Sequence, residues 1–273
     1  MTREIHASYK QFTLVFTVYV KGRQKLKVFA RDLKKPYTFY IFRTATVNGK
    51  RTFELKFPVS PDKMLIGVYD PATKPKQGFL PVDKENFKVP ENEMRIQKLR
   101  TYDIWQTPET KSFLKLAVEF SNNAGIYTSG KFYPSTYKSN DGKFRIDYYD
   151  QIIDKETGIA MTTPARVGHN TGLIEVSKKS FLNYTVPMRI VILLHEYSHK
   201  YLNPQIGRKI SDETGADINA LYIYLGNGFP DLEAHQAFLY VFKNANTDEN
   251  ARRYRVINDF ITKFSEGKIA KAA

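Results

Sequence analysis

Two histidines four residues apart, His195 and His199, flank a glutamate, Glu196, in a segment with helical periodicity. On a helix, side chains at positions i and i+4 project from one face, so both imidazoles can reach one ion. The pattern HExxH is typical of a zinc site in which the glutamate stands beside the ion. The four preceding residues are apolar, which places the helix in the core, where ion-free polar side chains would be costly to bury.

A catalytic zinc ion needs a third protein ligand and an open coordination position. Because the chain has no cysteine, this ligand must be a histidine or a carboxylate. The next predicted helix begins near Ser211, its expected N-cap, and carries Glu213 and Asp217 four residues apart on one face. Ligand chemistry alone allows either carboxylate. We therefore expect one Zn²⁺ per chain, bound by His195, His199 and one of these two carboxylates.

HExxH followed by ExxxD on a later helix resembles the gluzincin branch of the HExxH metallopeptidases. The resemblance favours Glu213 as the third zinc ligand and implies that Asp217 accepts a hydrogen bond from His195, which would fix the tautomer of that imidazole. Metzincins do not fit, because they require glycine and histidine where this chain has Leu202 and Gln205.

The same resemblance implies a zinc-dependent endopeptidase acting on a protein or peptide. Zinc would polarise the scissile carbonyl and acidify the attacking water, while Glu196 takes the proton as general base. A further donor would stabilise the oxyanion, and five residues are candidates by type: Tyr222, His235, Tyr197, Tyr201 and Tyr224. No GxxxxGK[ST] loop or G-x-S-x-G elbow occurs, so neither nucleotide hydrolysis nor serine-hydrolase chemistry is indicated.

Hydrophobic periodicity predicts the elements that position these residues. Thr107-Pro108-Glu109 is typical of a helix start, and the apolar spacing continues to about Asn122. Short strands are expected in residues 130–137, 143–153, 158–168 and 172–176, and helices in residues 185–202, 211–226, 231–242 and 247–264. The strand at 172–176 would hold an extended substrate by backbone pairing, or would be an ordinary covered strand.

Residues 1–85 alternate apolar and polar side chains, as in Phe12, Leu14, Phe16 and Val18, which is typical of half-buried strands. Asn48-Gly49 lies between two β-rich runs and predicts a tight hairpin turn. We therefore predict an α+β protein with three parts. These are an antiparallel β-sandwich or barrel as accessory domain at 1–85, a connector at 86–106, and a zincin-like domain of helix, small mixed sheet, HExxH helix and C-terminal helices at 107–273.

The net charge of +14 is concentrated in the first 104 residues, which hold 21 basic and 10 acidic side chains. Such an excess indicates an acidic partner, whether nucleic acid, an anionic surface or an acidic protein, or else only favours solubility. Nucleic-acid binding through residues 1–85 is the weaker hypothesis, because no DNA- or RNA-binding motif is visible there.

No run of 18 apolar residues occurs, and the first twenty residues carry charges, so we expect neither a membrane span nor an export signal. The absence of cysteine fits a reducing compartment, and the expected location is cytoplasmic or virion-associated. The basic first domain supports an alternative function as well. In that alternative the chain is a structural or assembly protein, such as a virion component, which retains a zincin-like fold with little or no activity.

Overall fold

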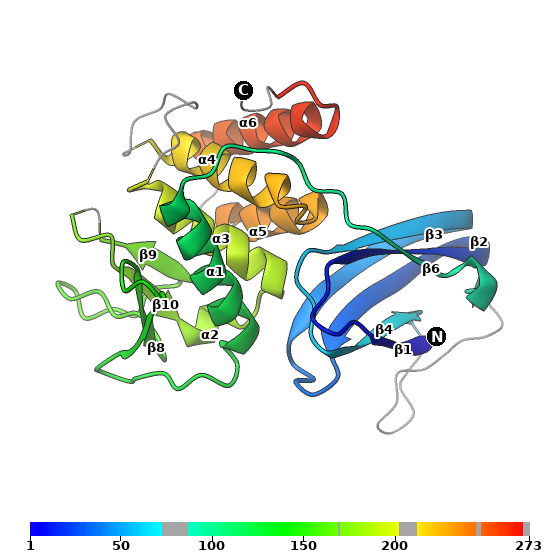
Figure 1. Ribbon diagram of the computed structural model, residues 1–273, viewed down its shortest axis with the longest axis horizontal. Coiled ribbons are helices and arrows are strands. Elements are labelled where there is room, and N and C mark those ends of the chain that lie inside the picture. The colour runs from blue at the N-terminus through cyan, green and yellow to red at the C-terminus, as the bar shows by residue number, and fades with distance from the viewer. Residues whose placement is uncertain (73–86, 169, 202–211, 244–246, 270–273) are drawn as a thin grey trace. The chain divides into compact units, whose positions relative to one another are not determined.

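The structure is a computed structural model, and it describes residues 1–72, 87–168, 170–201, 212–243 and 247–269. The chain forms two compact units, one of residues 1–100 with 228–230 and the other of residues 101–227 with 231–273. The class is α+β, as the sequence predicts, with an antiparallel sheet in the first unit and a small mixed sheet with helices in the second (Figure 1).

The first unit contains one six-stranded sheet with the order β1-β4-β2-β3, in which β5 and β6 also pair with β2. Its strands are β1 (Thr2–His6), β2 (Phe12–Asp32), β3 (Phe39–Phe57), β4 (Lys63–Tyr69), β5 (Phe87–Lys88) and β6 (Arg95–Gln97). All described pairings are antiparallel. The sheet includes β5 and β6, so it extends into the segment 86–106 for which the sequence predicts a connector. Among the described residues it is a single sheet, not the two packed sheets of a sandwich.

The turn that joins β2 to β3 lies at residues 33–38, so the hairpin turn predicted at Asn48-Gly49 is wrong. Asp32 closes the observed turn, because its carboxylate accepts hydrogen bonds from the backbone N–H groups of Lys34 and Lys35. Asn48 instead pairs with Arg23 inside the β2–β3 ladder, next to a register shift. Both Gly22 and Gly49 have positive φ at this irregularity, so the backbone that Asn-Gly favours serves a bulge in place of a turn.

The second unit places a four-stranded sheet of order β7-β8-β10-β9 beside its helices. Its strands are β7 (Ser135–Lys138), β8 (Arg145–Tyr149), β9 (Ala165–Val167) and β10 (Ile174–Ser177). Its helices are α1 (Pro108–Asn123), α2 (Lys178–Phe181), α3 (Val186–Ser198), α4 (Glu213–Gly226), α5 (Asp231–Lys243) and α6 (Asp248–Ser265). Only β10 and β8 are parallel, which makes the sheet mixed, as the sequence predicts.

Local sequence explains where the helices begin. Thr107 caps α1 by accepting a hydrogen bond from the Thr110 N–H at 3.1 Å, and Pro108 follows at the first helical position, as predicted. Residues 186–194 of α3 are all buried, and this helix packs against α1, α4 and α5. No helix in the described part of the chain is both long and apolar enough to cross a bilayer.

Arg189 joins α3 to two other helices from a fully buried position. Its side chain is 2% exposed and donates hydrogen bonds to the carbonyl groups of Ser121, Phe181 and Leu182 at 2.9, 3.3 and 3.3 Å. These carbonyls lie in the last turns of α1 and α2, where helix geometry leaves acceptors without an intrahelical donor. The guanidinium group therefore holds the start of α3 against the C-terminal ends of α1 and α2.

We predict that Arg189→Met lowers the free energy of unfolding by about 3 kcal/mol, because two buried carbonyls and a partly buried one lose their donor. Urea denaturation followed by circular dichroism measures this loss. The matched control is Lys111→Met on the exposed side of α1, which should change stability by less than about 0.5 kcal/mol. Equal midpoints for the two variants would contradict the assigned role.

Candidate metal centre

The two histidines and Glu213 come together where α3 ends and α4 begins. His195 lies in the last turn of α3, and His199 is the C-cap residue of that helix with a helical backbone. Glu213 is the first residue of α4. The cap of α4 is Asp212, whose carboxylate accepts from the Thr214 N–H at 3.0 Å, whereas the predicted N-cap, Ser211, lies outside the described residues.

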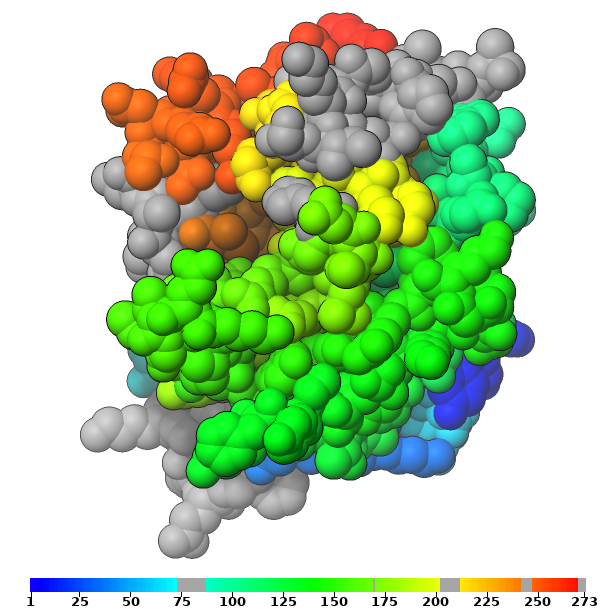
Figure 2. Space-filling model, turned by 90° about the vertical axis from the view of Figure 1, so that its left-hand side faces the viewer, coloured from blue at the N-terminus to red at the C-terminus, as the bar shows by residue number. Residues whose placement is uncertain are grey.

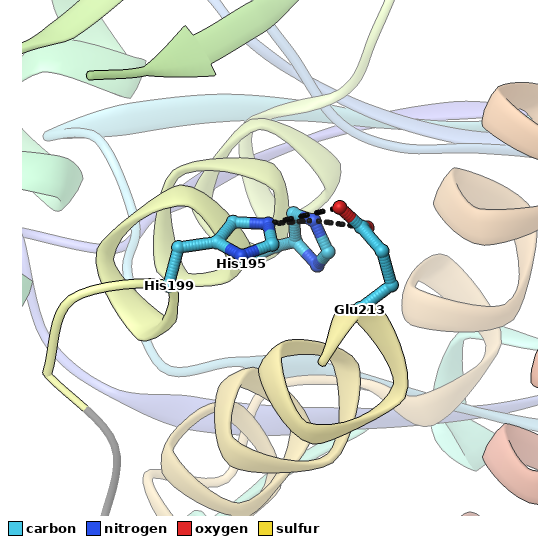
Figure 3. A group of neighbouring side chains, drawn as sticks. All are labelled: His195, His199 and Glu213. Carbon is cyan, nitrogen blue, oxygen red and sulfur yellow. Dashed lines mark hydrogen bonds and ion pairs between the residues drawn. The ribbon is translucent and has the colours of Figure 1, made fainter. Parts of the chain in front are cut away.

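The three side chains have the spacing of metal ligands. The Nε2 atoms of His195 and His199 are 3.1 Å apart, and they lie 3.4 and 3.5 Å from the carboxylate oxygens of Glu213. Figure 3 shows both rings turned towards this carboxylate. Metal–ligand bonds of about 2.0–2.1 Å in a tetrahedron place neighbouring ligand atoms roughly 3.3–3.4 Å apart. The group could therefore hold a metal ion at three corners of a tetrahedron.

Asp217 lies on the other side of the His195 ring. Its Oδ1 atom is 2.9 Å from Nδ1, at ion-pair distance. The carboxylate is fully buried. The structure thus brings Glu213, and not Asp217, to the two Nε2 atoms, and it puts Asp217 where it can orient the first histidine.

Arg253 on α6 completes the arrangement, and no sequence motif indicates it. Its Nε and Nη2 atoms donate to the two oxygens of Asp217 at 2.8 and 3.0 Å, and Nη2 lies 3.1 Å from Glu213. The residue is 36 positions beyond Asp217 on a separate helix, so local spacing carries no signal for it. One guanidinium group therefore holds both acidic residues of the ExxxD pattern.

The charges of these residues shift their protonation equilibria strongly. Burial alone would lower the pKa of His195, but Asp217 and Glu213 outweigh it and raise that pKa to about 10. The pairing with His195, helped by Arg253 and His199, lowers the pKa of Glu213 to about 2. In the absence of an ion the site is therefore a set of ion pairs, and a metal cation would bind by displacing the proton from His195.

Glu196 stands beside this group at the wall of a cleft of about 330 Å³. Met161 and residues 163–167, which include β9, line the cleft, and Val241 and Arg253 line it as well. Figure 2 shows a hollow between the green surface of the small sheet and the yellow and orange helices. Burial raises the pKa of Glu196 to about 7, although a hydrogen bond from the backbone N–H of Val167 opposes this shift.

The predicted oxyanion donors do not line this cleft. Tyr222 is 4% exposed, and its hydroxyl accepts a hydrogen bond from the Trp105 N–H at 3.4 Å. The His235 ring lies 6.5 Å from that of Tyr254, between α5 and α6. Among the other three candidates, Tyr197 bonds to the Thr110 hydroxyl in the core, and neither Tyr201 nor Tyr224 reaches the cleft. Among the described residues, the arginines that do line the cleft are Arg166 and Arg253.

The strand expected to receive a substrate is internal. β10, which contains most of the segment 172–176, lies between β8 and β9 in the small sheet. Of the two alternatives for this segment, the prediction of an ordinary covered strand is therefore correct. The edge of the sheet on this side is β9, which also borders the cleft. Sequence order could not distinguish the two strands, because both precede α3.

Comparisons of the chain with protein-family models, with curated proteins and with solved structures found no match. The function must therefore be argued from the geometry and chemistry of the site.

We predict that Arg253→Met lowers the free energy of unfolding of the metal-free protein by about 3 kcal/mol, because the buried Asp217 carboxylate loses its bidentate partner. Urea denaturation in the presence of a chelator measures the effect. Arg252→Met is the control, since Arg252 is the exposed neighbour on the same helix and should have little effect. A similar loss in both variants would mean that the contact with Asp217 contributes nothing specific.

Proposed function

We propose that the chain is a zinc-dependent metallopeptidase with a zincin-like second unit, which hydrolyses peptide bonds in a protein or peptide. The observation that supports the proposal is the meeting of His195, His199 and Glu213 at ligand spacing beside Glu196 and an open cleft. Structural zinc sites are usually closed by four protein ligands, whereas three ligands and an accessible position are typical of catalytic sites. Two imidazoles and one carboxylate are also ligands that zinc commonly takes.

The residues of the cleft have separate parts in the proposed reaction. When bound, zinc supplies Lewis acidity, which polarises a carbonyl group and makes water acidic near neutral pH. Glu196 accepts the proton from the attacking water and then donates it to the leaving amine as the peptide bond breaks. Asp217 and Arg253 hold His195 and Glu213 in position throughout.

The edge of β9 offers a place for an extended substrate. The backbone of Pro164 and that of Gly168 are hydrogen-bonded on the side of β10, to Ser177 and Leu173. Since these groups alternate in direction along an antiparallel strand, Ala165 presents its N–H and carbonyl at the outer edge, whereas the N–H of Val167 donates to Glu196 and leaves only its carbonyl there. A peptide adding to this edge would run along the wall of the cleft beside Glu196, which suits an endopeptidase.

Zinc content tests the ligands. We expect about one zinc per wild-type chain after loading and dialysis, and none in His199→Ala or Glu213→Ala. Asp217→Asn should still bind zinc, with an affinity about 10–100-fold weaker, because Asp217 acts through His195. Elemental analysis and chelator competition measure both quantities. If Glu213→Ala retained zinc and Asp217→Asn lost it, Asp217 would be the third ligand and Glu213 would not.

Activity tests the base. Glu196→Gln should keep its zinc and lose hydrolysis of a mixed peptide library by at least about 100-fold, because the amide cannot accept the proton from water. Glu156→Gln, on an exposed loop, is the matched control and should keep full activity. If the zinc-loaded wild type cleaves no peptide, the proposed activity fails and the alternative, an assembly protein with little or no turnover, becomes the better account.

A further inference from the structure

One face of the sheet in the first unit carries a cluster of four aromatic rings. Phe29 on β2 is paired with Phe42 on β3 and with Gly67 on β4, so these residues share a row across the sheet. The ring of Phe29 lies on Gly67, where a Cβ atom would be only 2.0 Å away. Phe39 and Tyr69 contact Phe29 with ring centroids 6.4 and 6.1 Å apart. The cluster is therefore built around a position that requires glycine.

Part of this cluster faces solvent. Phe42 is 42% exposed, and its ring lies 5.1 Å from that of Phe39. Phe39 and Tyr69 are partly exposed, whereas Phe29 beneath them is almost completely buried. An aromatic ring with one face packed on other rings and one side open to water offers a flat, pre-ordered surface.

Basic residues surround the rings on the same face. Lys27 is paired with Thr44 and Tyr69 in the adjacent row, and its Nζ atom lies 5.0 Å over the ring of Phe42. Lys25 and Arg31 occupy the neighbouring positions of β2 on this face. In the rows that run through residues 25, 27, 29 and 31, the one carboxylate among the described residues is that of Glu4, which lies 3.8 Å from the Lys63 ammonium. We call the group Phe29, Phe39, Phe42, Tyr69, Lys25, Lys27 and Arg31 the aromatic face.

A second pair of the same kind lies further along the sheet. Alternation along β3 puts Lys50 on the side of Phe42, and the Lys50 ammonium lies 5.4 Å from the ring of Tyr19, its cross-strand partner. Lys88 on β5 is the other cross-strand neighbour of Tyr19. The Tyr19 hydroxyl also donates to the Glu93 carboxylate at 2.7 Å, so this second pair has an acidic neighbour and is not included in the aromatic face.

We propose that the aromatic face binds single-stranded nucleic acid. Exposed bases are flat and stack on aromatic rings, while the phosphates between them pair with lysine and arginine. An acidic protein would satisfy the amines but offers no regular partner for the rings, and a duplex keeps its base faces stacked inside the helix. This inference is independent of the proposed peptidase activity, because it uses only residues of the first unit.

Fluorescence anisotropy of the full chain with a labelled oligothymidine of about 20 nucleotides tests the proposal, since single-strand sites on small β-domains span roughly 4–16 nucleotides. We expect binding that weakens as salt rises. Phe42→Ala should weaken it at least about 5-fold, whereas Phe42→Tyr, which keeps a ring, should bind like the wild type. Lys25→Gln with Lys27→Gln should reduce the slope of log affinity against log salt by about 1.4, because each phosphate contact contributes about 0.7.

The controls separate this site from general attraction of anions. Lys111→Gln with Lys115→Gln removes the same charge from the exposed side of α1 and should change neither affinity nor slope. Zinc removal should also leave binding unchanged. Three results would overturn the proposal. The first is equal oligothymidine binding by Phe42→Ala and the wild type, and the second is that both of these proteins bind heparin as tightly as the oligonucleotide. The third is binding to phosphatidylserine vesicles without binding to oligothymidine. The first two would indicate an acidic macromolecule without stacking bases, and the third an anionic membrane surface.

Discussion

A buried carboxylate organises the second unit. Asp217 has no contact with solvent, and an isolated ionised group in that position would cost several kcal/mol. Its compensation comes from His195 on α3 and Arg253 on α6, so three helices must be in place together before the charge is satisfied. The contacts that pack these helices together therefore also set the spacing of the candidate metal ligands.

Helix direction adds a favourable field to this arrangement. The histidines lie at the C-terminal end of α3, where the helix dipole is negative and favours a cation, and Glu213 begins α4, where the dipole is positive and favours a carboxylate. The candidate ion site thus falls between two helix ends of opposite sign, one of which favours a cation and the other the Glu213 carboxylate. Arg189, at the other end of α3, fixes the helix against α1 and α2.

Short-range spacing could be read from the sequence, and long-range contacts could not. The pairing of His195 with His199 was predictable because helix geometry alone sets which side chains share a face. Glu213 was favoured over Asp217 only by the family resemblance, and the helix starting after Thr107 was predictable from its cap. The Asn48-Gly49 turn was wrong because this dipeptide indicates a backbone conformation, which a bulge satisfies as well as a hairpin does. Contacts between distant segments determine the role of Arg253, the pairing of β5 and β6, and the edge position of β9. No local sequence pattern indicates such contacts. The zincin-like class itself stays a prediction.

The position of Arg253 has a consequence for biosynthesis. Domains of a nascent chain begin to fold as they emerge, at about 5–20 residues per second. The helices that carry His195 and Asp217 leave the ribosome before α6 does, because Arg253 follows Asp217 by 36 residues. Until α6 arrives, the buried Asp217 carboxylate lacks the guanidinium partner that helps to compensate its burial. The candidate ion site is therefore completed late in translation, by a segment that supplies none of its candidate ligands.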